Sequence, residues 1–403
     1  MSICPTEYWL WLQCALGAGA KTDELIAYFG DPEKMYNAGS AEWRLSGLLT
    51  DKKINALKSI SPSETGGIFR ECKAKGYSII TPDNINYPER LKQLRDMPLV
   101  LYALGDTSVL KDTVSIGVVG TRNASNYGIE TAQKLSFALA SSGVTIVSGG
   151  ALGIDSEAHA GAMLAKGRTV AFLGCGLSFD YLKENASLRR AITKYGAVVS
   201  EFAPFTPASR TTFPIRNRLI SGLTLGTLVI EAGIKSGSLI TANFALEQGK
   251  DVFAVPGDIV RSSFDGANHL IKNGAKPVFS AMDILSEYEY LYGDLIDFSK
   301  AETSLSQIPY VEYRKAKKTV VTKKPLINEK LVKEDKSKEK KKELDNSFSD
   351  EAKKVYSVLS SEPTHVDDIL RQTALKMSDV LSALTELELM GEIESIEGKK
   401  YKV

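Results

Sequence analysis

The 403-residue sequence contains few of the residues that build metal centres or disulfide scaffolds. Its four cysteines are scattered without a C-x-x-C pair, and its three histidines lie far apart. This pattern argues against a disulfide framework, a cysteine-rich zinc site and a histidine-rich metal centre, and it fits a reducing compartment. We therefore expect neither a metal nor a cofactor.

The sequence also lacks a long apolar run and an excess of charge of one sign. No apolar stretch reaches the ~18 residues that a membrane helix needs. The apolar segment 9–20 imitates a signal peptide, but Glu7 precedes it and no lysine or arginine does. The 50 Lys and Arg residues balance 49 Asp and Glu residues, so net charge indicates no particular partner. These features predict a cytoplasmic protein without a membrane segment.

Common nucleotide-binding and catalytic signatures are missing too. No GxGxxG or Walker A sequence is present, which argues against a nicotinamide dehydrogenase and a P-loop ATPase. No Ser/His/Asp set and no paired carboxylates stand out. Asp155 is a candidate base but also suits a helix start, and His159, one turn later, suits a packed core. We therefore expect a binding protein and not an enzyme.

Charge is distributed unevenly along the chain. Residues 312–345 hold 13 Lys and Arg against 7 Asp and Glu, without an apolar period. Such a segment cannot bury enough surface to fold, so it predicts a disordered tether, with a phosphate-attracting arm as the alternative. The predicted parts are a helical domain (1–65), a Rossmann-like domain (66–290), a lysine-rich linker (291–346) and a winged-helix domain (347–403).

Glycine-bounded strands dominate the second part. Of 32 glycines, 20 lie between Val114 and Ala275, many directly after short β-branched runs. Strands that alternate with helix-length segments predict an α/β fold, a doubly wound and mostly parallel sheet with helices on both faces. The predicted strands are SIGVVG, VTIVSGG, TVAFLGCG, AVVSEF, TLVIEA and DVFAVPG, and the predicted helices are 129–141, 154–165, 183–194 and 238–247.

The two ends of the chain have their own patterns. The first 60 residues look helical, and the LGAGA turn weakly resembles a helix-hairpin-helix (SAM-like) motif. Near the C-terminus, helices at 350–359, 366–371 and 378–389 precede a hairpin of 393–396 and 401–403, which predicts a winged helix. Its candidate recognition helix carries Lys376 but also three acidic residues, so we expect a regulatory or protein-binding role over duplex reading.

Three loops after predicted strands combine glycines, hydroxyls and cations. In open parallel sheets, ligands bind beyond the carboxyl ends of the strands. Each loop alone fits an ordinary turn with a helix cap, but together they predict a phosphate cradle. The loops are Gly120-Thr121-Arg122, Gly149-Gly150 and Lys235-Ser236-Gly237-Ser238.

Segment 209–223 adds Arg210 and two more arginines, an aromatic residue and an amide, without an acid. Helical phase turns Arg216 toward the buried face, with Glu201 or Glu231 as its expected partner, because buried charges must be paired. The same phase turns Asn217 and Arg218 outward, which makes them the better candidates for ligand contact. Phe213 precedes Pro214 and is expected in extended backbone, where it either joins the core or stacks on an unpaired base.

Several motifs, taken in order, resemble those of the DNA-processing protein A family (DprA, also called Smf). They are VVGTR, SGGALGID, FPIRNRLISG, SGSLITA and FAVPG, with NYPERLKQLRDMPLVLYALGD upstream and DGANHLIKNGA downstream. The resemblance spans about residues 75–285. It implies a non-enzymatic protein of natural transformation that binds and protects incoming single-stranded DNA and loads the RecA recombinase onto it.

The resemblance also implies roles for particular residues. It places Gly120, Thr121 and Arg122, the Gly237-Ser238 loop and the segment 210–218 on the DNA, and it makes Phe213 a base-stacking aromatic. It further implies a homodimer formed through the Rossmann-like domain, with Leu270 and Ile271 as candidate contacts.

Two alternatives remain open. One is a nucleotide-processing enzyme of the phosphoribohydrolase (lysine-decarboxylase-like) type, whose similar core carries a PGGxGTxxE signature. The comparable stretch here, LGTLVIE, lacks the paired glycines and places Glu231 one residue too far along. The other is a duplex-binding regulator that acts through the winged helix.

Overall fold

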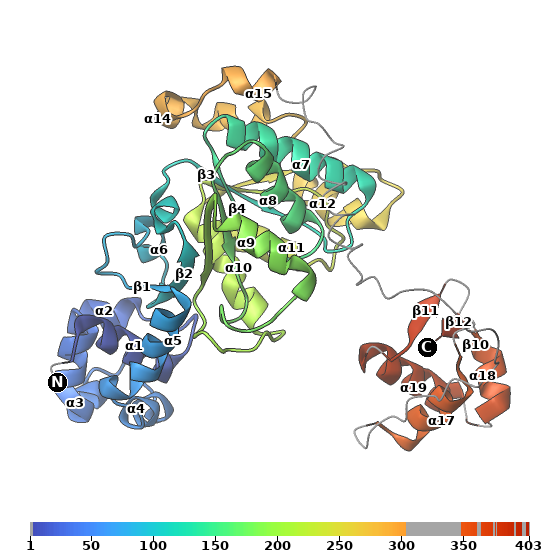
Figure 1. The fold of residues 1–403 in the computed structure, drawn as a ribbon, viewed down its shortest axis with the longest axis horizontal. Helices are drawn as coiled ribbons and strands as arrows, with labels where there is room; N and C mark the ends of the chain where they lie inside the picture. The colour runs from blue at the N-terminus through green and yellow to red at the C-terminus, as the bar shows by residue number, and fades with distance from the viewer. Residues whose placement is uncertain are drawn as a thin grey trace, which may run out of the picture. The chain divides into compact units, whose positions relative to one another are not determined.

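A computed structural model describes residues 3–303 and, nearer the C-terminus, residues 348–402 with gaps at 361–363, 374, 376, 391 and 397–399. The chain divides into two compact units, which meet in sequence at residues 316 and 317 and are described separately below (Figure 1). Most of the predicted linker, residues 304–346, lies outside the described residues. No helix in the described part of the chain is long and apolar enough to cross a membrane.

The first unit begins with a group of helices that pack around buried tryptophans. Trp11 is fully buried and its indole N–H donates to the carbonyl of Leu57 at 3.1 Å. Figure 1 shows these helices beside strands β1 and β2 of the sheet that follows. They are α1 (Pro5–Leu16), α2 (Asp23–Phe29), α3 (Pro32–Leu45), α4 (Asp51–Lys58) and α5 (Gly66–Lys75).

A nine-stranded sheet follows, with the order β1-β2-β6-β5-β4-β3-β7-β8-β9. The strands from β3 to β9 run parallel, whereas β2 pairs antiparallel with both β1 and β6. All six predicted strands are confirmed. The strands are β1 (Ser78–Ile80), β2 (Leu101–Gly105), β3 (Ser115–Val119), β4 (Thr145–Ser148), β5 (Thr169–Phe172), β6 (Gly196–Ser200), β7 (Gly226–Val229), β8 (Asp251–Ala254) and β9 (Lys276–Pro277).

Both faces of the sheet are buried, as its apolar strands predict. Val118 and Val119 of β3 point to opposite faces, because side chains alternate along a strand. Val118 packs in the core that includes α7 and α8, whereas Val119 belongs to the core that includes α10, α11 and the N-terminal helices. The helices around the sheet are α6 (Glu89–Lys92), α7 (Asn126–Ser141), α8 (Ile154–Leu164), α9 (Ala186–Ile192), α10 (Thr212–Leu223), α11 (Ser238–Glu247) and α12 (Asp265–Lys272).

The packed part of this unit extends to residue 303, beyond the predicted boundary at 290. Helices α13 (Met282–Leu285), α14 (Glu289–Tyr292) and α15 (Ser299–Thr303) follow the sheet. Ile296 and Ala301 are buried in the same core as α7, and the amide of Asp297 donates to the carbonyl of Ser142. The prediction that the linker begins at 291 is therefore wrong for residues 291–303, because Ile296 and Ala301 pack in the core that contains α7.

The second unit is a small domain of three helices and a three-stranded sheet, which confirms the predicted winged helix. Its apolar core includes Val355, Ile369 and Leu384. Glu386 lies on the predicted recognition helix, as expected. Its carboxylate accepts hydrogen bonds from the amide and the hydroxyl of Ser349 at the start of α17. The elements are α17 (Asp350–Val358), α18 (Val366–Thr373), α19 (Met377–Met390), β10 (Thr364–His365), β11 (Glu394–Ile396) and β12 (Lys400–Lys402).

Candidate nucleic-acid interface

The strand order creates a crevice beside β3. The chain leaves β3 outward through β4, β5 and β6 and then returns to the other side of β3 as β7. Loops diverge at such a switch point, and ligands bind there beyond the carboxyl ends of the strands. A cavity of about 260 Å³ lies at this place. Its lining residues are Val119, Gly120, Thr121, Arg122, Ala151, Asp155, Phe213, Arg216, Asn217, Ile220, Ser236, Gly237, Ser238 and Thr241.

The loop after β7 supplies one wall of this cavity. Helix α11 begins at Ser238, and the start of the helix lines the cavity with the positive end of its dipole. The first-turn amides are held by the loop itself: Ser238 donates to the Ser236 hydroxyl at 3.4 Å, and Leu239 donates to the Ser236 carbonyl at 3.1 Å. Gly237 has open space where a side chain would stand, which leaves its backbone accessible. The side-chain amide of Asn217 donates to the backbone carbonyl of Gly237 at 3.3 Å and so holds the loop in place. Lys235 is exposed just outside the cavity, so this wall suits an anion.

The loop after β3 forms the opposite wall. The amide of Thr121 donates to the carbonyl of Glu231 at 2.7 Å, and the amide of Ile154 donates to the carbonyl of Thr121 at 3.2 Å. A Cβ on Gly120 would lie 2.5 Å from the Ile154 side chain, so packing alone requires glycine here. Arg122 is exposed, and its guanidinium carbon lies 5.0 Å from the centre of the Phe213 ring.

Phe213 lies in the first turn of α10, not in the extended backbone that we expected before the helix. Pro214 is tolerated in this turn because its missing N–H has no acceptor inside the helix there. The Phe213 ring is half-buried, with Arg122 near the ring and Tyr181 at a ring-centre distance of 5.4 Å. Phe213 is therefore neither a sealed core residue nor a bare surface aromatic.

Arg216 is buried at the floor of the cavity, but its predicted partners are wrong. Its guanidinium donates to the carbonyls of Gly149, at 2.6 Å, and Phe172, and its Nε donates to Asn217 at 3.1 Å. Burial lowers the pKa of Arg216, and the nearby Asp155 opposes that shift. The Arg216 side chain thus lines the cavity as a positive charge that two backbone carbonyls hold in place.

Gly149 and Gly150 are buried beneath Arg216 and do not line this cavity. A Cβ on Gly149 would lie 2.5 Å from the Arg216 guanidinium, and the Gly150 carbonyl accepts from Asn185 at 3.0 Å. They line the adjacent small hollow together with Phe213 and Arg216. Their backbone also holds Arg216 and Asn185 in place.

Arg218 is an internal ion pair and not a surface cation. Its side chain is 2% exposed and donates to both oxygens of Glu201 at 2.6 and 2.7 Å. Asp96 lies 3.2 Å from its Nε. The expectation that Arg218 faces a ligand is wrong, and so is the expectation that Arg216 pairs with Glu201 or Glu231, because residues 216–223 of α10 are all buried. Burial raises the pKa of Glu201, and Arg218 opposes that shift.

The three titratable residues that the sequence raised as candidates have structural partners. Burial lowers the pKa of His159 to about 3, so its ring is neutral in the core, and its Nδ1 lies 2.7 Å from the Thr169 hydroxyl. Glu231 accepts from the amide and the hydroxyl of Ser125 at the start of α7 and does not line the cavity. Asp155 does line the cavity, where burial raises its pKa and Arg216 opposes that shift.

Two further aromatic residues near the cavity escaped the sequence analysis. Phe179 and Tyr181, in the loop after β5, share a small hollow with Phe213 and Arg216. The only signal for them was two rings within SFDY, directly after a glycine-rich turn. Arg210, in the loop before α10, is exposed but does not line the cavity.

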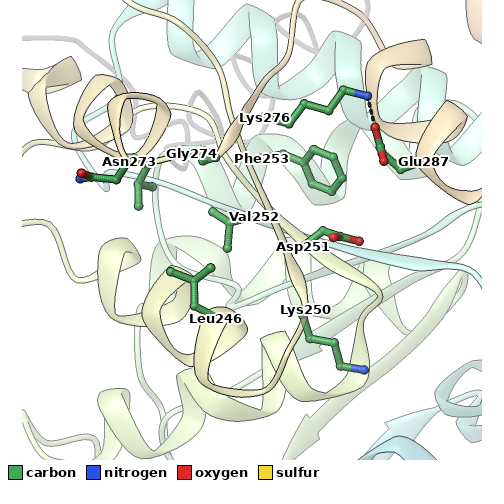
Figure 2. Close-up of a pocket in the computed structure, with 11 residues that line it drawn as sticks. Leu246, Lys250, Asp251, Val252, Phe253, Asn273, Gly274, Lys276 and Glu287 are labelled. Carbon is green, nitrogen blue, oxygen red and sulfur yellow. Dashed lines mark hydrogen bonds and ion pairs between the residues drawn. The ribbon is translucent and has the colours of Figure 1, made fainter.

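A larger cavity of about 400 Å³ lies at the other edge of the sheet, near the amino ends of β8 and β9 (Figure 2). Figure 2 shows Lys250 and Asp251 on one side and the ion pair of Lys276 with Glu287 on the other. Its two lysines are balanced by two carboxylates, so it has no preference for an anion. Leu270 lines this cavity but is itself buried.

Comparisons with known proteins match both units. The family model for DNA recombination-mediator protein A matches residues 78–289, and the model for the DprA winged helix domain matches residues 339–399. Protein Smf of Synechocystis sp. is 33% identical over 364 residues, which cover 88% of this chain and 86% of that protein. DNA processing protein DprA of Bacillus subtilis is 42% identical over 215 residues, which cover 53% of this chain and 72% of that protein.

A solved structure matches the first unit. The X-ray structure of DNA processing protein A (DprA) from Streptococcus pneumoniae superimposes with a TM-score of 0.61 at 33% identity. The superposition covers 71% of this chain and 99% of that chain. The fold of this chain is therefore similar to that of the Streptococcus pneumoniae protein.

Proposed function

Since this chain belongs to the DNA recombination-mediator protein A (DprA/Smf) family, we propose that it binds single-stranded DNA at the cavity beside β3, without catalysing a reaction. In this role it protects incoming DNA and loads the RecA recombinase onto it during natural transformation. One observation carries the proposal: Arg122, Phe213 and the start of α11 converge on one cavity.

The cavity suits one nucleotide of an unpaired strand. Its volume of about 260 Å³ is just below the ~300–1,000 Å³ typical of small-molecule sites. A phosphate at the Gly237 amide and at the hydroxyls of Ser236 and Ser238 meets the positive end of α11, with Arg122 and Lys235 at the rim. The base then lies against Phe213. Because Arg122 now lies near that ring, it must swing aside, toward the phosphate, when a base stacks there.

Single strands are favoured over duplexes by the same geometry. A base in a duplex is already stacked and paired, so it offers no free face to Phe213. The direct contacts that we propose are Thr121, Arg122, Phe213, Asn217, Lys235, Ser236, Gly237 and Ser238, with Arg210 further along the strand. Gly120 and Arg216 shape and charge the cavity, and Gly149, Gly150 and Arg218 support it from within.

Two partners follow from the family resemblance. RecA is the recombinase that receives the strand, which places the protein in the cytoplasm. A second copy of the chain, joined through the Rossmann-like domain, brings two cavities onto one strand and so raises the effective affinity. Leu270 is buried and Ile271 partly buried, so a dimer contact here uses mainly the exposed residues around them.

A gel-shift experiment with the full chain tests the proposal. Labelled single-stranded DNA, duplex DNA and a mononucleotide are compared, with ATP hydrolysis followed in the same tubes. We expect a shift of the single strand, little shift of the duplex and no hydrolysis, and we expect Arg122→Ala to weaken the shift for every sequence alike. Equal binding of duplex and single strand contradicts the role of Phe213. Release of a base from the mononucleotide supports the phosphoribohydrolase alternative instead.

A further inference from the structure

Aromatic side chains continue beyond the cavity, in the loops that follow β5 and β6. Phe179 is 37% exposed and Phe205 is 66% exposed, and Tyr181 is half-buried. The Tyr181 ring centre lies 5.4 Å from that of Phe213, with an angle of 48° between the ring planes. We call the set of Phe179, Tyr181 and Phe205 the aromatic platform.

Backbone hydrogen bonds hold the two loops of the platform together. The amide of Gly176 donates to the carbonyl of Thr206, and the amide of Ser178 donates to the carbonyl of Pro204, both at 2.8 Å. The hydroxyl of Thr212, at the start of α10, donates to the carbonyl of Gly174. The rings are thus presented by a braced surface that is already fixed next to Phe213. A prearranged surface loses less entropy when it binds a ligand.

The charge around the platform is close to balanced, so stacking and not charge carries the argument. Arg210, Lys183 and the α9 residue Arg190 are exposed near the exposed acids Asp180 and Glu184, and Lys183 lies 3.5 Å from Asp180. The loop after β8, at the opposite end of the same sheet edge, is the competing surface. It exposes Ile259 and Val260, each 87%, and has one exposed ring beside it, that of Tyr127, whose hydroxyl donates to the Pro256 carbonyl at 3.2 Å. The platform has three rings. Stacking on aromatic rings beside cations is how proteins hold unpaired bases, so the platform is the better surface.

We propose that the aromatic platform is a second subsite for single-stranded DNA, which stacks the bases that flank the nucleotide held in the cavity beside β3. The inference rests on the proposed function. It adds the direction in which the DNA strand runs from the cavity and the number of nucleotides that are bound. The strand leaves Phe213 toward Tyr181 and Phe205, and its backbone passes the cations of the same loops. The bound segment is therefore several nucleotides long.

The test measures how affinity depends on strand length. Fluorescence anisotropy of the full chain with labelled oligothymidylates, from a mononucleotide to about 16 residues, compares wild type with Phe205→Ala. Tyr290→Ala is the matched control. Tyr290 is 97% exposed and follows Tyr288, whose hydroxyl donates to Asp251 at the amino end of β8, so it lies away from the platform.

We expect wild type and Tyr290→Ala to bind more tightly as the strand lengthens. Phe205→Ala is expected to bind the longer strands about 10-fold more weakly, since one stacked base is lost, and to bind the mononucleotide as wild type does. Photo-crosslinking to a halogenated strand is expected to mark peptides from the loops after β5 and β6.

Two outcomes separate this inference from the proposed function. If Phe205→Ala and wild type bind all lengths alike, the platform does not bind DNA and belongs to a protein partner or to no partner, so the inference is overturned while the cavity stands. If wild type binds no single strand at any length, the proposed function itself fails. Loss of binding at every length in Arg122→Ala, with Phe205→Ala impaired only on long strands, supports both.

Discussion

Replacement of Arg218 by alanine is expected to destabilise the fold and not to remove a DNA contact. The guanidinium and the Glu201 carboxylate are both 2% exposed and share two short hydrogen bonds. Without Arg218, the hydrogen-bond donor that remains to that carboxylate among the described residues is the Gly19 amide, at 3.0 Å from Oε1. Leaving one partner of such a pair uncompensated costs about 3–5 kcal/mol. Asp96 adds less, because its side chain is 29% exposed and water screens it.

Urea denaturation followed by tryptophan fluorescence measures this loss. Trp9, Trp11 and Trp43 are all buried in the N-terminal helices. Their fluorescence therefore changes when these helices unfold. The deficit should depend on pH. Burial raises the pKa of Glu201 above its ordinary value of 4.5, and loss of the cation raises it further, so ionisation of Glu201 opposes folding of the variant. The stability difference from wild type should be largest near neutral pH and should narrow as pH falls toward about 4.5.

Two companion variants make the result decisive. Glu201→Gln in the Arg218→Ala background should recover part of the lost stability, because no buried charge is left alone. Arg122→Ala, at an exposed position, should leave the urea midpoint unchanged and weaken DNA binding. The reasoning is refuted if Arg218→Ala unfolds like wild type, or if it keeps full stability and loses DNA affinity.

Phe213→Ala should cost about 1–3 kcal/mol in single-strand affinity and leave the thermal unfolding midpoint nearly unchanged; a variant that unfolds instead places the ring in the core. The logarithm of the binding constant should fall with the logarithm of salt concentration by about 0.7 per neutralised phosphate, and titrations of Lys235→Ala should show a shallower slope. Burial holds the pKa of His159 at about 3, below its ordinary 6.5, so stability should fall as pH drops from 6.5 toward 3, and thermal scans of His159→Gln should show less loss across that window. Deletion of residues 348–403 should leave single-strand affinity unchanged, whereas a loss would favour the winged helix as the DNA reader.

Local pattern was enough to predict the parallel sheet. Most of the predicted strands are β-branched runs that end in a glycine-containing turn, and both faces of the sheet are covered, so the runs are almost continuously apolar. The same turns brought Arg122 and the Ser236-Gly237-Ser238 loop to one edge, because the carboxyl ends of parallel strands meet there. The convergence of these two loops with Phe213 on one cavity was therefore foreseeable.

The roles of Arg216 and Arg218 were not foreseeable by helical phase. That reasoning assumes that one side of a helix faces water, but Arg216, Asn217 and Arg218 are three consecutive buried residues. Helix α10 packs between the sheet and other helices, so each arginine had to find an internal acceptor on its own side. Which acceptor it found depends on segments far away in sequence, such as Gly149 for Arg216 and Glu201 for Arg218.

Strands β1 and β2 were missed for a related reason. They are short, and β2 pairs antiparallel with β6, almost a hundred residues further along the chain. No turn signal links β2 to β6, so no local sequence pattern predicts that these strands pair. The same limit hid the neighbourhood of Phe213, since Arg122 and Tyr181 reach it from different loops.

The hydrogen bond between Gly19 and Glu201 links the N-terminal helices to the buried ion pair beside the central sheet. The Gly19 amide donates to the carboxylate that Arg218 neutralises, and a Cβ on Gly19 would lie only 2.9 Å from Ile215. In a related protein without the first sixty residues, this ion pair would be exposed to solvent, where an ion pair contributes little to stability. The leading helices and the Arg218–Glu201 pair are thus expected to be inherited together or lost together among related proteins.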